Sequence, residues 1–250
     1  MRRAAALVVA TCAVLAACSA HGVEPTPRPV PPSATTLRPT TTPAPSPTPP
    51  PDADRVRAAG TKVTSGGAAI RVLPAPGVDM ARSKDDDGSV RLSFDAGGTA
   101  TDEPLAFVTG SGATAFADGT ALAGHGGLSP SGASLRPSSD DVLGLYARAD
   151  AEASVWFSGT AVEDTDWGER EGGRSLAVTP TAWARDGGLA ASELTWTQLV
   201  AREPDADSGT MHDQLRCHEL GAPDKATWNL EPWRPQVDGL AMIAARCNPT

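Results

Sequence analysis

The chain has 250 residues and a formal net charge of −9, with 21 Lys and Arg against 30 Asp and Glu. This acidic balance argues against a nucleic-acid partner and against electrostatic adhesion to anionic lipid, because both need clustered positive charge. The first fifth of the chain has little to bury, so about two hundred residues remain for one or two folded domains.

Residues 1–20, MRRAAALVVATCAVLAACSA, have the pattern of an export signal. Arg2 and Arg3 form a positively charged start, and the apolar run at residues 4–17 is too short for a transmembrane helix. We therefore expect the protein to be exported.

The end of this signal, Leu15-Ala16-Ala17-Cys18, resembles the lipobox of bacterial lipoproteins. In that family the signal is cut just before the Cys, whose sulfur carries a diacylglyceryl group. The resemblance implies a signal peptide at residues 1–17 and acylation of Cys18; the alternative is an ordinary secretory signal with an incidental Cys. Two or more acyl chains would hold the protein stably on the membrane, since each buried CH₂ contributes about 0.8 kcal/mol.

Residues 21–54 are a tract of Pro, Thr and Ser, which predicts disorder with polyproline II character. At about 3.1 Å per residue, some thirty such residues extend roughly 90 Å. Together with acylated Cys18, they predict that residues 18–54 form a stalk. The simplest role of such a stalk is that of a passive spacer.

Residues 55–154 predict a β-rich domain, because the apolar residues follow period two more often than a helical period. Asp87-Gly88 and Asp118-Gly119 tolerate the positive φ of tight hairpins. A small antiparallel sheet or sandwich would contain strands at residues 69–73, 90–94, from 107 onward, and at 113–117, 120–123, 142–147 and 153–157.

The acidic run DDDG at residues 85–88 raises a calcium site as an alternative, since carboxylates on alternate residues before a Gly can surround a hard cation. The EF-hand spacing fails here. With Gly88 as the loop glycine, the first ligand would be Ser83 and the bidentate Glu would be Phe94. Turn chemistry instead favours a solvated hairpin tip.

Residues 155–250 predict a small α+β domain, which places the whole chain in the α+β class. All six Trp lie in the chain beyond residue 150. A strand begins at Arg174, and Pro180 is expected to lie at its edge or to bend it. A helix is predicted at residues 192–202, with Ser192 as its N-cap.

A second helix is predicted to begin at Thr210, whose spacing to Asp213 matches a variant of the capping box. Gly221 can end this helix in the left-handed conformation. Cys217 shares a helix face with Leu220, and we expect this face to point toward the core.

Five short motifs are found in this region: EGGRSL at residues 171–176, VTPT at 178–181, TMHDQLRCH at 210–218, WNLEPWRP at 228–235 and CNP at 247–249. Together they resemble the DUF2599 family of actinobacterial secreted proteins. The resemblance covers roughly residues 155–250. Because the function of that family is unassigned, the resemblance implies no catalytic residue.

Cys217 and Cys247 are the Cys that remain outside the signal and the lipobox. In an oxidising exterior such a pair most often forms a disulfide, which we predict. The alternative is a metal site made by these two Cys with His212 and His218. Zinc accepts such ligands, but structural zinc sites use two paired ligands on each side, so we predict no metal and no other cofactor.

A catalytic site in the same region would use His212 or His218 as general base, oriented by Asp213, Glu219 or Glu231. No nucleophile stands out, and HExxH, GxSxG, CxxC and Gly-rich phosphate motifs do not occur in the sequence. We therefore predict no catalytic residue.

The WNLEPWRP segment is the leading candidate for ligand binding. Trp228 and Trp233 are five residues apart, so on an extended chain they point to opposite sides. An exposed Trp beside Glu231 and Arg234 would suit the recognition of a sugar or a peptide. Under the alternative interpretation, both Trp lie in the core and Glu231 braces Arg234 internally.

The sequence as a whole predicts a lipid-anchored lipoprotein of the cell envelope, on the outer face of the plasma membrane. The anchor, the stalk and the lack of a catalytic motif favour a non-enzymatic binding module. Its expected partners are the plasma membrane, through the lipid anchor, and a cell-wall glycan or envelope protein. The alternative function is an envelope hydrolase, or an inhibitor of one, that uses residues 212–234.

Overall fold

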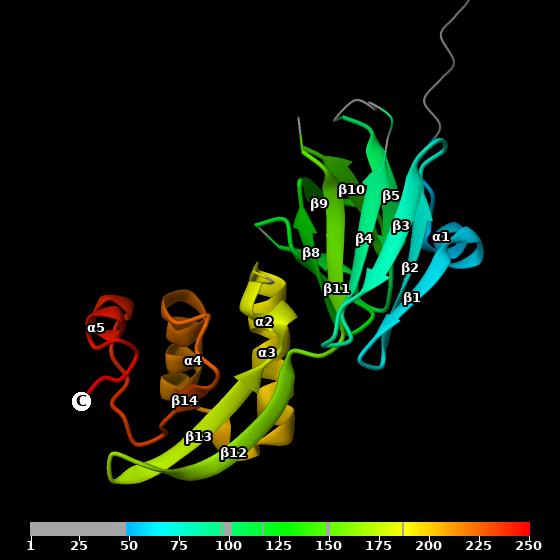
Figure 1. The fold of residues 1–250 in the computed structure, drawn as a ribbon. Coiled ribbons are helices and arrows are strands. Elements are labelled where there is room, and N and C mark those ends of the chain that lie inside the picture. Colours follow the sequence, from blue (N-terminus) through cyan, green and yellow to red (C-terminus); the bar gives the residue numbers. More distant parts are fainter. Residues whose placement is uncertain (1–48, 96, 98–101, 117, 149–150, 187) are drawn as a thin grey trace, which may run out of the picture. The chain divides into compact units, whose positions relative to one another are not determined.

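The computed structural model describes residues 49–95, 97, 102–116, 118–148, 151–186 and 188–250. The predictions for the signal, for Cys18 and for most of the stalk therefore lie outside the described residues. Thr48–Thr250 form one compact unit, which contains three antiparallel sheets and several helices (Figure 1). The predicted α+β class is confirmed. Among the described residues, no helix has the length and apolar character needed to span a membrane.

The first sheet has five strands in the order β1-β2-β5-β10-β9. A short helix, α1 (Ala53–Ala59), lies on its outer face, where Val56 packs against Phe107 and Val142. The strands are β1 (Thr61–Ser65), β2 (Ala68–Pro74), β5 (Pro104–Thr109), β9 (Ala133–Ser139) and β10 (Val142–Ala147).

The second sheet has six strands in the order β3-β4-β11-β8-β7-β6. On β4, Val90, Leu92 and Phe94 are buried while the residues between them are more exposed, and these three join the inward residues of the first sheet in one core. The two sheets thus form a β-sandwich. The strands are β3 (Asp79–Lys84), β4 (Val90–Asp95), β6 (Thr114–Ala115), β7 (Ala121–Ala123), β8 (Gly126–Ser131) and β11 (Ala153–Ser158).

Strand predictions succeed both with a clear apolar alternation, as in β4, and without one, as in β10. The predictions at residues 90–94 and 142–147 coincide with β4 and β10. The third predicted strand starts too late, because β5 already begins at Pro104. Strands β1, β3, β8 and β9 are not predicted from the sequence; β3, for example, is exposed along nearly its whole length and has no apolar alternation to reveal it.

The acidic run before Gly88 forms the β3–β4 turn, and Gly88 has a φ of +81°. The prediction of a solvated tip needs correction for Asp87. Its Oδ1 accepts from the Ser89 N–H at 3.0 Å, and its Oδ2 accepts from the Trp183 N–H at 3.0 Å. Burial raises the pKa of Asp87, but hydrogen bonds from Ser89 and Trp183 outweigh burial and lower the pKa below its ordinary value.

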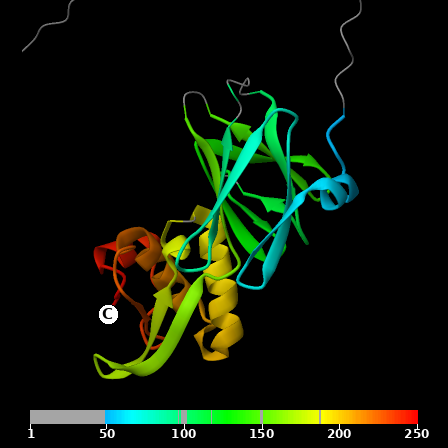
Figure 2. The same ribbon diagram turned by 45° about the vertical axis from the view of Figure 1, so that its right-hand side comes forward.

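The third sheet has the order β12-β13-β14 and packs with helices. Figures 1 and 2 both show α3 beside the β12–β13 hairpin, and Arg202 on α3 donates to the Glu163 carbonyl at 3.2 Å. The elements are β12 (Val162–Arg170), β13 (Gly173–Pro180), α2 (Ala182–Asp186), α3 (Gly188–Arg202), a 3₁₀ turn (Pro204–Ala206), α4 (Gly209–Gly221), β14 (Trp228–Leu230) and α5 (Gly239–Ala244).

Helix α3 begins four residues earlier than predicted, and Ser192 is not its N-cap. The sandwich turn at residues 118–120 accepts the first N–H groups of the helix: Leu189 donates to Asp118 at 3.0 Å, and Ala190 donates to Thr120 Oγ1 at 3.1 Å. A negative side chain is favourable at a helix N-terminus, so the turn stabilises the start of α3 from a distant part of the chain.

The predicted N-cap of α4 also needs correction. Ser208 caps the helix, with its Oγ accepting from the Met211 N–H at 3.4 Å. The hydroxyl of Thr210 instead donates to the Arg234 carbonyl at 3.1 Å. This bond draws the WNLEPWRP segment onto the first turn of α4.

The C-terminal end of α4 departs from two further predictions. The helix ends at Gly221, but its C-cap is Ala222 with a φ of −152°, outside the left-handed region. Leu220 is 81% exposed, whereas Cys217 is buried. These two side chains therefore do not point into the core together.

Candidate functional site

The WNLEPWRP segment begins as a strand that belongs to the core. Trp228 and Leu230 on β14 are fully buried against β13 and α4. The indole Nε1 of Trp228 donates to the Ala222 carbonyl at 3.0 Å, which satisfies its polar atom. Trp228 therefore serves the core and offers no surface to a ligand.

After β14 the chain turns, and the turn sends neighbouring side chains in different directions. The Arg234 N–H donates to the Glu231 carbonyl at 3.3 Å, with Pro232 at the position of a β-turn where its fixed φ is favourable. Glu231 and Arg234 are buried, while Trp233 is 44% exposed. Of the four candidate binding residues, the structure places only Trp233 at the surface.

Gln214 on α4 fixes the position of this turn. Its Nε2 donates to the Glu231 carbonyl at 3.0 Å, and its Oε1 accepts from the Glu231 N–H at 2.9 Å. The same Nε2 also contacts Thr210 Oγ1 at 3.2 Å. Because Gln214 is fully buried, its amide holds the backbone of the turn in a water-excluded setting.

Arg234 is the centre of an internal ion-pair network. Its Nε donates to Glu231 at 2.7 Å, one terminal nitrogen donates to Glu171 at 2.7 Å, and the other donates to the Pro249 carbonyl at 3.2 Å. The side chains of Arg234 and Glu231 are both 0% exposed. Burial lowers the pKa of Arg234, but the two carboxylates outweigh burial and raise the pKa above its ordinary value.

One interpretation of the sequence places both Trp in the core and makes Glu231 an internal brace for Arg234. The structure contains this brace, but Trp233 is exposed. The brace joins the turn at residues 231–234 to the tip of the β12–β13 hairpin, where Glu171 lies, and to the C-terminus. Ser175 on β13 donates to the second oxygen of Glu231 at 3.2 Å, so both carboxylate oxygens have a partner.

The exposed ring of Trp233 rests on a fitted support. A Cβ at Gly173 would lie 2.2 Å from Nε1 of Trp233, so the close approach of the indole requires glycine there. The guanidinium carbon of Arg234 lies 4.5 Å from the centroid of the Trp233 ring system, a cation–π distance. Trp233 is therefore held in a defined position while a part of its surface faces solvent.

The predicted disulfide between Cys217 and Cys247 is present, with 5.4 Å between the two Cα atoms. It packs with Met242 of α5 and ties the C-terminal segment to α4. Pro249, the carbonyl partner of Arg234, lies two residues beyond Cys247. The disulfide therefore supports the brace, and it removes two thiolates from the alternative metal set.

The two His side chains considered for catalysis have separate partners. The Nε2 of His218 donates to the Asn229 carbonyl at 3.0 Å, and burial lowers its pKa, so a neutral ring is favoured. His212 packs against Trp196 with 4.5 Å between ring centroids and the two rings tilted by 39°. Asp213 accepts from Gln236 at 3.2 Å. The structure does not bring these groups together as a base and its orienting carboxylate.

Glu219, the other carboxylate considered, lies between α4 and α3. It accepts from Ser192 Oγ at 2.8 Å, and burial raises its pKa to about 7. Within the described ranges, no three His, Cys, Asp or Glu side chains gather in the way that a metal ion would need.

Three residues that support Trp233 did not stand out in the sequence: Glu171, Gly173 and Gln214. Glu171 and Gly173 lie in the EGGRSL motif, so the glycine pair was the available signal for a hairpin tip. Gln214 carries no such signal, because its role depends on a bond to a segment seventeen residues away.

The fold is one compact unit, in which a β-sandwich continues into a disulfide-closed α+β part that presents one supported Trp. Residues 162–250 match the family DUF2599, whose description is protein of unknown function. No solved structure gave a significant match.

Curated relatives from mycobacteria match about a third of the chain. Uncharacterized proteins of Mycobacterium tuberculosis and Mycobacterium bovis are 40% identical over 96 residues, which cover 35% of this chain and 65% of each relative. An uncharacterized protein of Mycobacterium leprae is 38% identical over 81 residues, covering 31% of this chain and 60% of the relative. The chain thus spans less than two thirds of the length of the curated relatives that it matches.

Proposed function

We propose that the protein is a lipid-anchored lipoprotein of the cell envelope whose DUF2599-like part binds a cell-wall glycan through Trp233. The observation that carries the proposal is the exposed indole of Trp233 on its support of Gly173 and Arg234. The anchor would be acylated Cys18, and the Pro- and Thr-rich stalk would carry the domain away from the plasma membrane.

A rigid, half-exposed aromatic ring suits a sugar, because the ring face packs against the C–H groups of a pyranose. Holding the ring in advance lowers the entropy cost of binding. Glu171 adds a polar group beside the ring: one oxygen accepts from Arg234, and its side chain is 57% exposed. A carboxylate at this edge can accept hydrogen bonds from sugar hydroxyls, which gives the platform an orientation.

The test is co-sedimentation of the full chain with insoluble cell-wall glycan from an actinobacterium, with competition by soluble oligosaccharides of N-acetylglucosamine. Trp233→Ala should weaken retention about tenfold, the loss expected for one aromatic stacking contact. Trp233→Phe keeps a ring and should retain part of the binding.

Leu240→Ala is the matched control, because Leu240 is an exposed apolar side chain on α5 with 82% exposure. It should bind as the unmodified protein does. The proposal would be refuted if Trp233→Ala sedimented with the glycan as strongly as the Leu240 variant, with both variants folded by circular dichroism.

A further inference from the structure

A shallow pocket of about 190 Å³ lies on the outer face of the five-stranded sheet, beside the last turn of α1. It is far in the sequence from the DUF2599-like part and takes no part in the function proposed above. Three cationic side chains and two hydroxyl side chains line it: Arg57, Lys62, Arg71, Thr109 and Ser111.

The strand register explains why these side chains converge. Lys62 on β1 lies directly opposite Arg71 on β2, and Arg71 lies directly opposite Thr109 on β5. Residues directly opposite each other in an antiparallel pair share a face of the sheet. Val63 and Val72, their neighbours in sequence, are fully buried on the other face, so Lys62 and Arg71 lie on the outer face of the sheet; Thr109 shares that face but is itself buried.

This local excess of positive charge is unusual for a chain with a net charge of −9. Like charges placed directly opposite each other across two strands are destabilising, and Lys62 and Arg71 are such a pair. In the part of the chain that the structure describes, the side chain of Lys62 forms no ion pair and no hydrogen bond. An anion in the pocket would relieve this repulsion.

The other two cationic side chains, Arg71 and Arg57, use only a part of their capacity for hydrogen bonds and ion pairs within the protein. Arg71 donates one bond to the Gly60 carbonyl at 3.1 Å, which leaves further N–H groups of its guanidinium. Arg57 pairs with Asp54 at 3.0 Å, but the Asp54 side chain is 95% exposed, so water screens this pair. Asp54 is thus a weak competitor for an anion that reaches Arg57.

We propose that this pocket binds a phosphate group, as inorganic phosphate or as the monoester of a small soluble molecule. A phosphate carries about two negative charges and three or more acceptor oxygens, which matches donors arriving from three elements. A carboxylate has one charge and is satisfied by one guanidinium. The hydroxyl of Thr109 already donates to the Asp141 carbonyl at 2.6 Å, so Ser111 is the hydroxyl donor available to the ligand.

The test is isothermal titration of the full chain with inorganic phosphate at low ionic strength, together with thermal unfolding in the same buffers. Phosphate should bind saturably and raise Tm, and Lys62→Met should weaken binding about tenfold. Lys84→Met removes the same charge from an exposed position on β3, in the other sheet, and should leave the affinity unchanged.

A second readout separates a binding role from a folding defect. Without phosphate, Lys62→Met should unfold at the same Tm as the unmodified protein or at a higher one, because the substitution removes the repulsion from Arg71. Arg57→Gln, on α1, should also weaken phosphate binding. A titration with sodium acetate should show at least tenfold weaker binding than phosphate.

Three results would overturn the proposal: no saturable phosphate binding, equal losses in the Lys62 and Lys84 variants, or acetate binding as tight as phosphate. Vesicles of phosphatidylglycerol test for a lipid source of the phosphate. Binding to these vesicles through Lys62 without binding of inorganic phosphate would also contradict it, since it would assign the surface to a membrane.

Discussion

Arg234→Met is the perturbation that tests the brace beneath Trp233. It removes three polar contacts from a side chain with no exposed area, and it leaves Glu231 buried without its charge partner. Breaking a buried pair from one side typically costs about 3–5 kcal/mol, whereas domains are stable by about 5–15 kcal/mol. We therefore expect a large loss of stability from one substitution.

The assay is equilibrium unfolding in urea, followed by Trp fluorescence, with the free energy of unfolding taken by linear extrapolation. Arg174→Met is the matched control. Arg174 also pairs with an acidic residue, Asp205, at 3.3 Å, but both side chains are more than half exposed. A pair of this kind contributes about 0–1 kcal/mol, so the control should unfold close to the unmodified protein.

A double variant tests the role of the buried Arg234–Glu231 pair even if Arg234→Met is barely folded. Adding Glu231→Gln to Arg234→Met removes the orphaned charge, so the double variant should recover at least about 1.5 kcal/mol relative to Arg234→Met. If Arg234→Met cost no more than Arg174→Met, or if Glu231→Gln gave no recovery, the buried pair would not brace the turn.

Two further predictions concern Glu219 and Cys18. Burial raises the pKa of Glu219 from its ordinary value of 4.5 to about 7 in the folded state. Between these two pH values the folded protein binds more protons than the unfolded chain, so the contribution of Glu219 to stability is present at low pH and is lost as the pH rises toward 7. Glu219→Gln does not titrate, so its free energy of unfolding relative to the unmodified protein should rise by at most about 3 kcal/mol from pH 4.5 to pH 8; a flat difference would refute this. Cys18→Ser should move the protein from the membrane fraction to the medium on cell fractionation, and a variant that stayed membrane-bound would refute anchoring at this residue.

The sequence predicts those parts of the fold in which the residues that determine an element lie within that element or next to it. Residues 90–94 alternate apolar and polar side chains, and β4 forms there because its apolar side enters the sandwich core. The β3–β4 hairpin likewise turns at Gly88, in the Asp87-Gly88 pair from which a tight turn is predicted. The disulfide between Cys217 and Cys247 was predictable because Cys12 and Cys18, the other two cysteines, fall in the predicted signal and lipobox.

The wrong start predicted for α3 has a physical cause, which is capping by distant residues. Ser192 is a good N-cap by its local sequence, but Asp118 and Thr120 of the sandwich accept the first N–H groups of α3 four residues earlier. Asp87 accepts from Trp183 at the start of α2 in the same way. These bonds join residues about seventy to a hundred positions apart, so a local window of sequence cannot show them.

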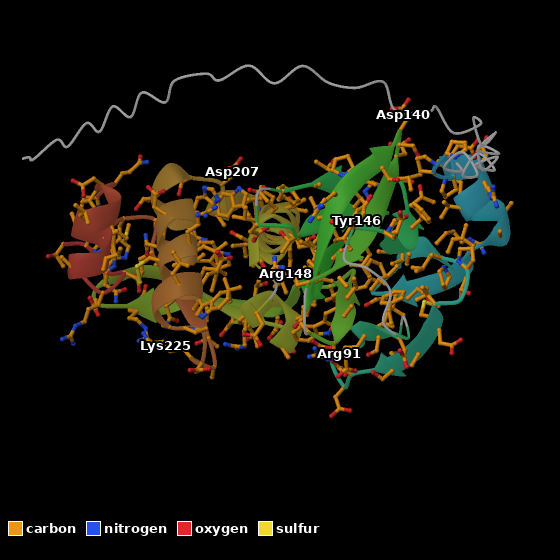
Figure 3. All side chains as sticks on the ribbon, turned by 90° about the horizontal axis from the view of Figure 1, so that it is seen from above. Arg91, Asp140, Tyr146, Arg148, Asp207 and Lys225 are labelled. Atoms are coloured by element: carbon orange, nitrogen blue, oxygen red, sulfur yellow. A yellow bond between two sulfur atoms is a disulfide. The ribbon has the colours of Figure 1, made fainter. Side chains whose placement is uncertain are left out.

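The same turns explain how the sandwich and the helices share a core. Trp183, whose backbone N–H donates to Asp87, is fully buried. Its indole donates to the Trp156 carbonyl at 3.2 Å. Trp156 is also covered by Arg91, labelled in Figure 3, whose guanidinium carbon lies 3.8 Å from the ring centroid. A Cβ at Gly127 would lie 2.2 Å from the Trp183 ring, so this contact has no spare room.

The exposure of Trp233 follows from the burial of its neighbour. Gln214 fixes the backbone of Glu231, the ion pair draws Arg234 inward, and a turn this tight then has one direction left for the indole, over Gly173. Amphipathic pattern could not show this, because here the charged residue is inside and the apolar residue is outside. An aromatic side chain held out by a buried ion pair has a defined position without a partner, and that property is what a preformed binding surface needs.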